Sequence, residues 1–496
     1  MRIIESSLIL WPLVVTLVAP FLILLAAKRV NLRESISFVA GAITFALVLT
    51  AAPTILEGKI LRYELFRLLP GVTVTFCLDG LGFIFAFIAP FLWVLATSYN
   101  IGYMRSLKEH AQTRYYFCFA VAIFGAVGVA MAANVFTLYL FYEIISVFTY
   151  PLVAHHQDEE GFTGAKKYLV YLMGTSKLFL LPAMALTYYL AGTLDFPLSG
   201  IKNGIFTPEV VAANPDLVRL TYVLYIAGLA KAALMPFHNW LPSAMVAPTP
   251  VSALLHAVAV VKAGVFSVSR MILSGFGAET MTVLGLSIPT AYVAGFTIVV
   301  ASLIALTKDD IKARLAYSTV SQLSYVVLGV ALVAPLSMQG GLLHIGHHAF
   351  SKITLFFGAG AIYVASHLKS IKMMNGLGRK MPLTFGAFGL ASLSMIGFPP
   401  VCGFVSKWYL VNGALQQEQM IILVALLLST ILNAGYFVPI FYRAFFLKPE
   451  PGSRVEECQE APLSMVVPLT LTSLASLFLG FFPGAFHNFI KIFGGF

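Results

Sequence analysis

The chain contains few charged residues and few cysteines for its length, and each shortage argues against a class of protein. Only 10% of its 496 residues are charged, whereas a water-soluble globular protein has about 25%. Hydrophobic residues make up 59% of the chain, so we predict a membrane protein that spans the bilayer many times. The four cysteines have no paired spacing, which argues against an iron–sulfur centre, structural zinc or a disulfide framework.

Two nucleotide-binding patterns are also missing from the sequence. We find neither a Gly-rich phosphate loop nor a dinucleotide-binding fingerprint. We therefore expect no redox or hydrolytic site, no cofactor and no bound metal in this chain.

Apolar runs of about 20 residues, long enough to cross a bilayer core of roughly 30 Å as helices, recur along the whole chain. They predict an all-α polytopic fold with about 14 transmembrane helices and no soluble domain between them. The first run is expected to be retained, because no small-residue cleavage site follows it. The predicted spans are 7–27, 35–56, 78–99, 114–132, 134–154, 164–191, 218–240, 250–272, 283–306, 314–334, 340–364, 382–415, 420–445 and 463–485.

The net charge of +10 is explained by membrane topology rather than by nucleic-acid binding, because cytoplasmic loops collect Lys and Arg. With the amino terminus outside, the inner loops carry eighteen basic residues and the outer loops carry eight, Arg270 among them. We therefore expect both termini on the non-cytoplasmic side of a bacterial or archaeal cytoplasmic membrane. The five remaining basic residues lie inside predicted spans: Lys177, Lys231, Lys262, Lys352 and Lys407.

All five of these intramembrane cations are lysines by this assignment. Arginine stays protonated, whereas a buried lysine can release and regain a proton. The pattern therefore favours titrating groups over static cations, although a lysine near the end of a span can also extend its ammonium to the membrane surface.

Glu143 is the one carboxylate predicted deep in a span, whereas Asp79, at the start of the third span, is expected at the membrane interface. A charge at the centre of a helix costs about 2.5–3.5 kcal/mol, so we expect a lysine partner for Glu143, namely Lys231. Such a pair is either a fixed link between two helices or part of a functional switch.

His344, His348 and Lys352 follow one another at intervals of four residues, which places them on one helix face. Because histidine titrates near neutral pH, this column is predicted to relay protons. A zinc site is disfavoured because the third member is a lysine. His347 points elsewhere and is expected to be an ordinary hydrogen-bonded core histidine.

Further candidates have weaker support from the pattern. His256 and Lys262 share the eighth span but not one face, so Lys262 is expected to meet partners on another helix. The secondary candidates for proton transfer are Lys177, His256 and His238.

Two predicted spans are broken by proline beside a lysine. Pro236 follows Lys231 in the seventh span, and Pro399 and Pro400 precede Lys407 in the twelfth. Proline frees backbone groups, which a membrane tolerates only where protein or water covers them. Both breaks therefore predict hydration next to a lysine.

The two breaks lie five spans apart, which is typical of transporters built from repeats. An odd offset makes the two units inverted. The predicted division is residues 1–113 for helices 1–3, 114–272 for the first five-helix repeat, 283–445 for the second and 463–485 for helix 14.

Four motifs carry a resemblance to a known family: GLAKAALMPFHNWLPSAMVAPTPVSALLHAVAVVKAG (228–264), KDDIKARLAYSTVSQLSYVVLG (308–329), HIGHHAFSKITLFFGAGAI (344–362) and GFPPVCGFVSK (397–407). They resemble the antiporter-like proton-conducting subunits. That family comprises large membrane subunits of respiratory complex I, the A and D proteins of Mrp-type cation/proton antiporters, and membrane-bound hydrogenase relatives.

The resemblance implies a subunit of a multisubunit membrane complex that moves H⁺ along a hydrated polar axis. Such a complex can itself be an NADH:quinone oxidoreductase or a hydrogenase-type enzyme, so the chain's status as part of an enzyme stays open. The proton-transfer positions that the resemblance implies are Glu143, Lys231, Lys262, His344, His348, Lys352 and Lys407.

Within the family, the His-rich eleventh span and Lys407 resemble most those of MrpD, the D protein of the Mrp-type Na⁺/H⁺ antiporter, or of a hydrogenase-type relative. We expect neither the lateral helix of the largest complex I subunit nor the extra carboxy-terminal domains of the Mrp A protein. Sodium prefers several oxygen ligands, and one glutamate among lysines is a poor site for it. Any Na⁺ path is therefore expected in a partner protein of the complex. The alternatives are a non-conducting structural subunit of a redox complex and, with less support, an organic-solute transporter.

Overall fold

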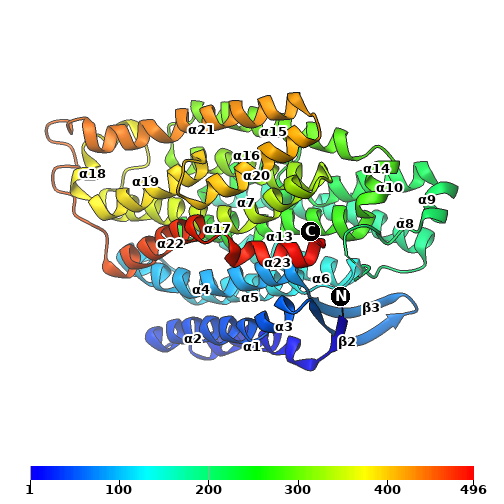
Figure 1. The fold of residues 1–496 in the computed structure, drawn as a ribbon. Coiled ribbons are helices and arrows are strands. Elements are labelled where there is room, and N and C mark those ends of the chain that lie inside the picture. The colour runs from blue at the N-terminus through cyan, green and yellow to red at the C-terminus, as the bar shows by residue number, and fades with distance from the viewer. Residues whose placement is uncertain (1, 199) are drawn as a thin grey trace.

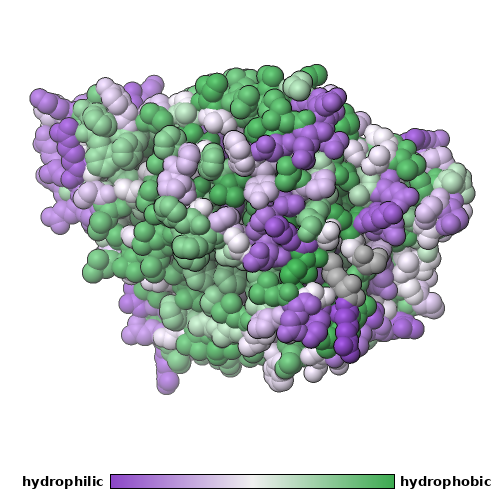
Figure 2. Space-filling model, viewed as in Figure 1, coloured by the Kyte–Doolittle hydropathy of each residue, from purple (hydrophilic) through white to green (hydrophobic). Residues whose placement is uncertain are grey.

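The structure is a computed structural model that describes residues 2–198 and 200–496. Its helices run roughly parallel to one another in an elongated bundle (Figure 1). Hydrophobic side chains cover most of the visible surface left of the centre, and hydrophilic ones gather at the left end, in a band right of the centre and on the right side (Figure 2). This distribution fits a protein whose middle zone lies in lipid.

The helices account for nearly all of the regular structure. Those of the first half are α1 (Trp11–Leu25), α2 (Val30–Leu49), α3 (Ala52–Leu56), α4 (Gly80–Ser106), α5 (Gln112–Ala130), α6 (Val135–Val153), α7 (Glu159–Thr175), α8 (Leu181–Ala191), α9 (Pro208–Ala213), α10 (Pro215–Gly228) and α11 (Trp240–Ser243). Those of the second half are α12 (Thr249–Ala253), α13 (Val260–Arg270), α14 (Gly277–Val283), α15 (Ser287–Thr307), α16 (Ile311–Ala331), α17 (Pro335–Ser366), α18 (Leu377–Lys380), α19 (Pro382–Ile396), α20 (Cys402–Gln416), α21 (Met420–Phe446), α22 (Leu463–Phe481) and α23 (Gly484–Gly494).

Each of the fourteen predicted spans falls on helical structure. Among the described residues, eleven helices are long and apolar enough to cross a membrane. The seventh and twelfth spans are not among the eleven because they are broken, and the tenth, α16, is 21 residues long but more polar. The mostly helical, polytopic fold is confirmed, whereas the division into repeats stays a prediction.

Helix starts are fixed by polar caps at the ends of apolar runs. Asp79, Asn134, Asp158 and Asp310 each accept a hydrogen bond from a backbone N–H of the first turn, at 2.7 to 2.8 Å. Such a cap is worth about 1 kcal/mol. It satisfies a donor that has no partner within the helix.

A small three-stranded sheet is an element that the sequence analysis missed. β1 (Arg2–Glu5) pairs in parallel with β2 (Lys59–Leu69), which pairs in antiparallel fashion with β3 (Val72–Leu78). The sheet lies at one end of the bundle, near both chain termini (Figure 1). It therefore joins the segment before the first span to the segments between the second and third spans.

α17 is the central helix of the bundle. It packs against α4, α16, α19, α20 and α22, and every residue from 337 to 362 is buried. At about 1.5 Å per residue, its 32 residues extend roughly 48 Å. Polar side chains on this helix therefore face other protein segments rather than lipid.

Both predicted helix breaks are present. α10 ends at Gly228, and Lys231 lies in a short 3₁₀ turn, Ala230–Ala232, before α11 begins. α19 ends at Ile396 and α20 begins at Cys402. α10, α19 and α20 each extend about 21–23 Å, too short to cross a bilayer core of roughly 30 Å alone.

Candidate functional site

Lys231 lies in the break of the seventh span and is completely buried. Its Nζ donates to the carbonyl oxygen of Tyr142 at 2.8 Å and to Ser146 Oγ at 2.6 Å, both on α6. The ammonium also lies 3.1 Å from the centre of the Tyr142 ring. These oxygen acceptors and the electron-rich ring face compensate the buried cation for lost water.

The backbone that the break exposes is satisfied by side chains. The Lys231 N–H donates to Tyr142 Oη at 3.1 Å, and Trp240 Nε1 donates to the Ala230 carbonyl at 3.1 Å. A Cβ on Gly264 would lie 2.3 Å from the Ala232 nitrogen. Glycine therefore lets α13 approach the turn that carries Lys231.

Glu143 does not contact Lys231, which corrects the predicted pair. Its carboxylate accepts a hydrogen bond from Lys177 Nζ at 2.9 Å. Lys177 also donates to Tyr139 Oη and is 45% exposed at its side chain. The physical reason is the direction in which these groups point from α6. The Tyr142 carbonyl and Ser146 face Lys231, whereas Glu143 faces the π-helical turn Ser176–Leu180 that follows α7.

Lys262 and His348 form the closest contact between titratable side chains of the predicted axis. Lys262 Nζ lies 2.7 Å from His348 Nδ1, and both residues are completely buried. The contact joins α13 to α17, so the predicted partner of Lys262 on another helix is His348. A hydrogen bond of this length is short enough for direct proton transfer.

His344 lies one helical turn before His348, with the two ring centres 6.0 Å apart. Its Nδ1 is 2.8 Å from Ser406 Oγ and its Nε2 is 3.0 Å from Gln322 Oε1. Because the Gln322 oxygen can only accept, Nε2 carries the proton and Nδ1 accepts in the neutral ring.

Lys352 lies one turn beyond His348 and is completely buried. Its Nζ donates to Ser318 Oγ at 2.9 Å and to the Leu315 carbonyl at 3.3 Å. Tyr436 Oη donates to the same Ser318 hydroxyl at 3.1 Å, and it also contacts Asn433. The polar line therefore continues from α17 through α16 to α21.

Lys407 closes the opposite side of the site. Its Nζ donates to the carbonyl oxygens of Met395 at 2.7 Å and Ile396 at 3.0 Å, the last residues of α19. The Met395 carbonyl also accepts from Gln322 and Asn433. A cation at a helix C-terminus is favourable, so the ammonium caps the first half of the broken helix.

The remaining histidine candidates lie off this line. His256 is buried and stacks on Phe356, with ring centres 4.5 Å apart. His238 is partly buried in the break, 6.4 Å from the Tyr317 ring centre. His347 is buried with no hydrogen bond to any described residue, so the expectation of a satisfied core histidine is wrong.

Asp79 and Arg270 correct a second expectation. Both are buried, and the guanidinium donates to the two carboxylate oxygens at 2.6 and 2.9 Å. The sequence pattern predicts Arg270 in a loop, but the eighth span continues as helix to Val283; Asp79 lies at the start of the third span, as the N-cap of α4. Buried cations are therefore not all lysines, although this arginine has a bidentate carboxylate partner.

Several polar residues of the site are absent from the sequence-based candidates. Ser318, Gln322 and Tyr325 of α16 all face the axis, and the ring of Tyr325 lies 4.9 Å from Lys407 Nζ. Their spacing of four and three residues places them on one helix face. That spacing could have identified them from the sequence. Asn433 and Tyr436 of α21 could have been identified only as polar residues in an apolar run.

A polar cavity opens at the end of the bundle opposite to the sheet. It has a volume of about 580 Å³. Charged and histidine side chains line it, and Thr249 and Ala359 form part of its wall. Ala359 lies seven residues from Lys352 on α17, a rise of about 10 Å. The lining side chains with charge or imidazole are Glu109, His156, Glu160, Asp310, Lys312, His367 and Lys369.

Comparison with known proteins shows what the chain is similar to. Residues 132–433 match the family described as NADH:quinone oxidoreductase/Mrp antiporter, TM. The chain is 31% identical to NADH-quinone oxidoreductase subunit N of Desulforudis audaxviator, with 95% of each covered. It is 29% identical to the A protein of the Na(+)/H(+) antiporter of Alkalihalophilus pseudofirmus, covering 83% of this chain and 53% of that longer protein. A chain of the Mrp complex from a Dietzia species has the same fold, with a TM-score of 0.86, 21% identity and coverage of 99% and 96%.

Proposed function

The chain belongs to the NADH:quinone oxidoreductase/Mrp antiporter transmembrane family, and from this premise we propose that it conducts protons along the buried line of lysines and histidines. It is an antiporter-like membrane subunit of a multisubunit complex of the Mrp or complex I type. The observation that carries the proposal is the 2.7 Å contact between Lys262 and His348. It links two helices through groups that can both gain and lose a proton.

Protons enter this line from the polar cavity. Lys352 lies about 10 Å along α17 from Ala359 in the cavity wall, and the proposed path requires water to bridge this distance. From Lys352 the proton passes to His348 and Lys262, and then by way of His344 to Lys407. Four of the five groups lie on or contact α17, and Ser406, next to Lys407, contacts His344.

Glu143 acts as the switch for Lys231. In the structure Glu143 is held by Lys177, and Lys231 is held by neutral oxygen atoms instead of a carboxylate. In this arrangement Lys231 lacks the carboxylate partner that would hold its proton most strongly. When Glu143 turns toward Lys231, the ammonium is stabilised and the lysine is reloaded.

Reconstituted complex in sealed vesicles tests this function. Lys231→Ala and Glu143→Ala should each abolish proton uptake, followed with a pH-sensitive dye, while the purified complex keeps its subunits. Lys202→Ala is the control because Lys202 is exposed in a loop and should leave uptake unchanged. Normal uptake in both site variants would contradict the switch.

A non-conducting structural role is the second candidate, and the cap that Lys407 forms on α19 favours it. A cap needs only positive charge near the carbonyl oxygens of Met395 and Ile396. Lys407→Arg and Lys231→Arg separate the two functions, because arginine keeps the charge but does not release its proton. Activity that persists in both variants supports the structural role, and loss of proton uptake supports conduction.

We place the chain at the position of MrpD, or of its homologue in a complex I or hydrogenase-type assembly. The chain aligns with 95% of the oxidoreductase subunit N and with 53% of the antiporter A protein. Any Na⁺ path lies in a partner protein of the complex. Copurified iron–sulfur subunits would assign it to a respiratory complex, and small membrane subunits alone to an Mrp antiporter.

The membrane is the cytoplasmic membrane of a bacterium or archaeon, with both termini on the non-cytoplasmic face. The sheet pairs residues 2–5 with residues 59–62, and Phe83 stacks on Phe489 of the carboxy-terminal α23 at 4.3 Å. Both contacts place the termini at one end of the bundle. Cysteines introduced at either terminus should react with an impermeant thiol reagent added outside intact cells.

A further inference from the structure

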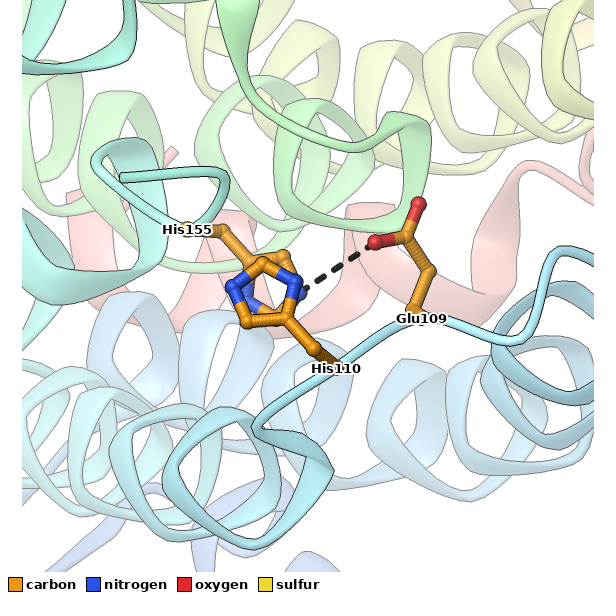
Figure 3. Close-up of side chains that lie close together, drawn as sticks. All are labelled: Glu109, His110 and His155. Atoms are coloured by element: carbon orange, nitrogen blue, oxygen red, sulfur yellow. Dashed lines mark ion pairs between the residues drawn. The ribbon is translucent and has the colours of Figure 1, made fainter. Parts of the chain in front are cut away.

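Three side chains outside the buried line lie close together, and one of them, Glu109, lines the polar cavity. Glu109 and His110 come from the loop between α4 and α5, and His155 follows α6. One potential ligand atom from each lies within 4.8 Å of the other two. Figure 3 shows the two imidazole rings overlapping and the carboxylate directed toward His155.

His155 has the features of a metal ligand. Its side chain is completely buried, Nε2 lies at an ion-pair distance of 3.5 Å from Glu109 Oε2, and neither ring nitrogen makes a hydrogen bond to any described residue. Buried imidazole nitrogens are normally paired, and an orphan calls for an explanation. The ring is held in place through its backbone, since Arg114 donates to the His155 carbonyl at 2.9 Å.

The spacing of the potential ligand atoms fits a small transition-metal ion. Bonds of about 2.1 Å at tetrahedral angles place neighbouring ligand atoms about 3.4 Å apart. His155 Nε2 and Glu109 Oε2 are 3.5 Å apart. The His110 ring is exposed, and its centre is 4.8 Å from that of His155.

The chemistry of the donors selects the ion. Imidazole suits zinc and its neighbours, whereas Mg²⁺ and Ca²⁺ take oxygen ligands. Two histidines and one glutamate form a known zinc ligand set that leaves a fourth position open for water. A further imidazole, that of His156, has its Nδ1 3.8 Å from Glu109 Oε2.

We propose that Glu109, His110 and His155 bind Zn²⁺ at the wall of the polar cavity. No metal motif is visible in the sequence because the ligands come from two loops separated by α5 and α6. Glu109 belongs both to the cluster and to the cavity lining. An ion bound here therefore occupies the Glu109 carboxylate, which lies where protons enter.

The consequence is that Zn²⁺ slows proton uptake by this subunit. This consequence rests on the proposed proton path, whereas the binding site itself does not. A bound ion removes Glu109 as a proton acceptor and places positive charge at the cavity wall, which repels incoming protons. Binding and inhibition are measured by separate experiments.

Binding is tested on the purified complex after removal of any histidine tag and of bound metal with a chelator. Zinc is added, free ion is dialysed away, and bound zinc is counted by mass spectrometry. One ion per chain is expected, and His110→Ala and Glu109→Gln should weaken binding at least about tenfold. His367→Ala is the matched control, since His367 lines the same cavity and is exposed but lies outside the cluster.

His110 is exposed, so its replacement tests the site without disturbing the core. Equal zinc content in His110→Ala, Glu109→Gln and wild type would overturn the site, as would equal retention of Mg²⁺. If zinc binds as expected but proton uptake by the wild-type complex is unchanged at saturating zinc, the site stands and its role at the proton entrance is refuted. Zinc inhibition that disappears in His110→Ala supports both claims.

Discussion

Replacing His348 tests whether the buried line carries protons. In His348→Ala, the ammonium of Lys262 loses the ring nitrogen 2.7 Å away, and both residues are completely buried. A buried donor left without its partner costs about 1–3 kcal/mol. If this cost falls on the transfer step, proton uptake slows about 5- to 150-fold.

Two further variants separate the loss of a relay group from simple damage to the core. His347→Ala removes an equally buried ring from the same helix, but one without hydrogen bonds to described residues. It should reduce stability to a similar degree and leave uptake nearly unchanged. His348→Asn keeps an oxygen acceptor near Lys262 but cannot carry a proton, so stability should recover while uptake stays low.

The assay is dye-monitored proton uptake by the reconstituted complex, normalised to the amount of assembled complex, with unfolding temperatures measured in parallel. Equal uptake in His348→Ala and His347→Ala would refute the reasoning, because position in the polar line would then make no difference. Full uptake in His348→Asn would refute proton transfer through the ring and would leave His348 only a structural role.

Two other substitutions probe how the fold holds the site. Gly397→Ala places a methyl group 2.7 Å from Lys407 Cδ at a φ of +92°, so we expect the lysine to be displaced from its cap. Stability should fall by about 1–2 kcal/mol, which lowers the unfolding temperature, and an unchanged melting curve would contradict this. Arg270→Met leaves the buried Asp79 carboxylate without its two hydrogen bonds and should cost about 3–5 kcal/mol, seen as a large loss of purified, assembled protein, and normal yield and melting temperature would argue against the pair's importance.

The positions of the helices along the chain were largely predictable from the sequence. A lipid environment requires about 20 apolar residues per crossing, so the spans are visible as composition alone. The His344, His348 and Lys352 column follows from helical periodicity within one segment, and the proline breaks follow from local backbone chemistry. Each of these features depends on neighbours in sequence, which is why no tertiary information was needed.

The partners of the charged groups were decided only by the tertiary structure. Lys177 instead of Lys231 holds Glu143, and Arg270 reaches Asp79 across 191 positions of sequence. A buried charge needs a compensating partner, but the sequence offers several carboxylates and oxygen acceptors that could serve equally well. Which one does so depends on how helices rotate and approach one another, and that is set by the packing of apolar side chains and glycines over the whole bundle.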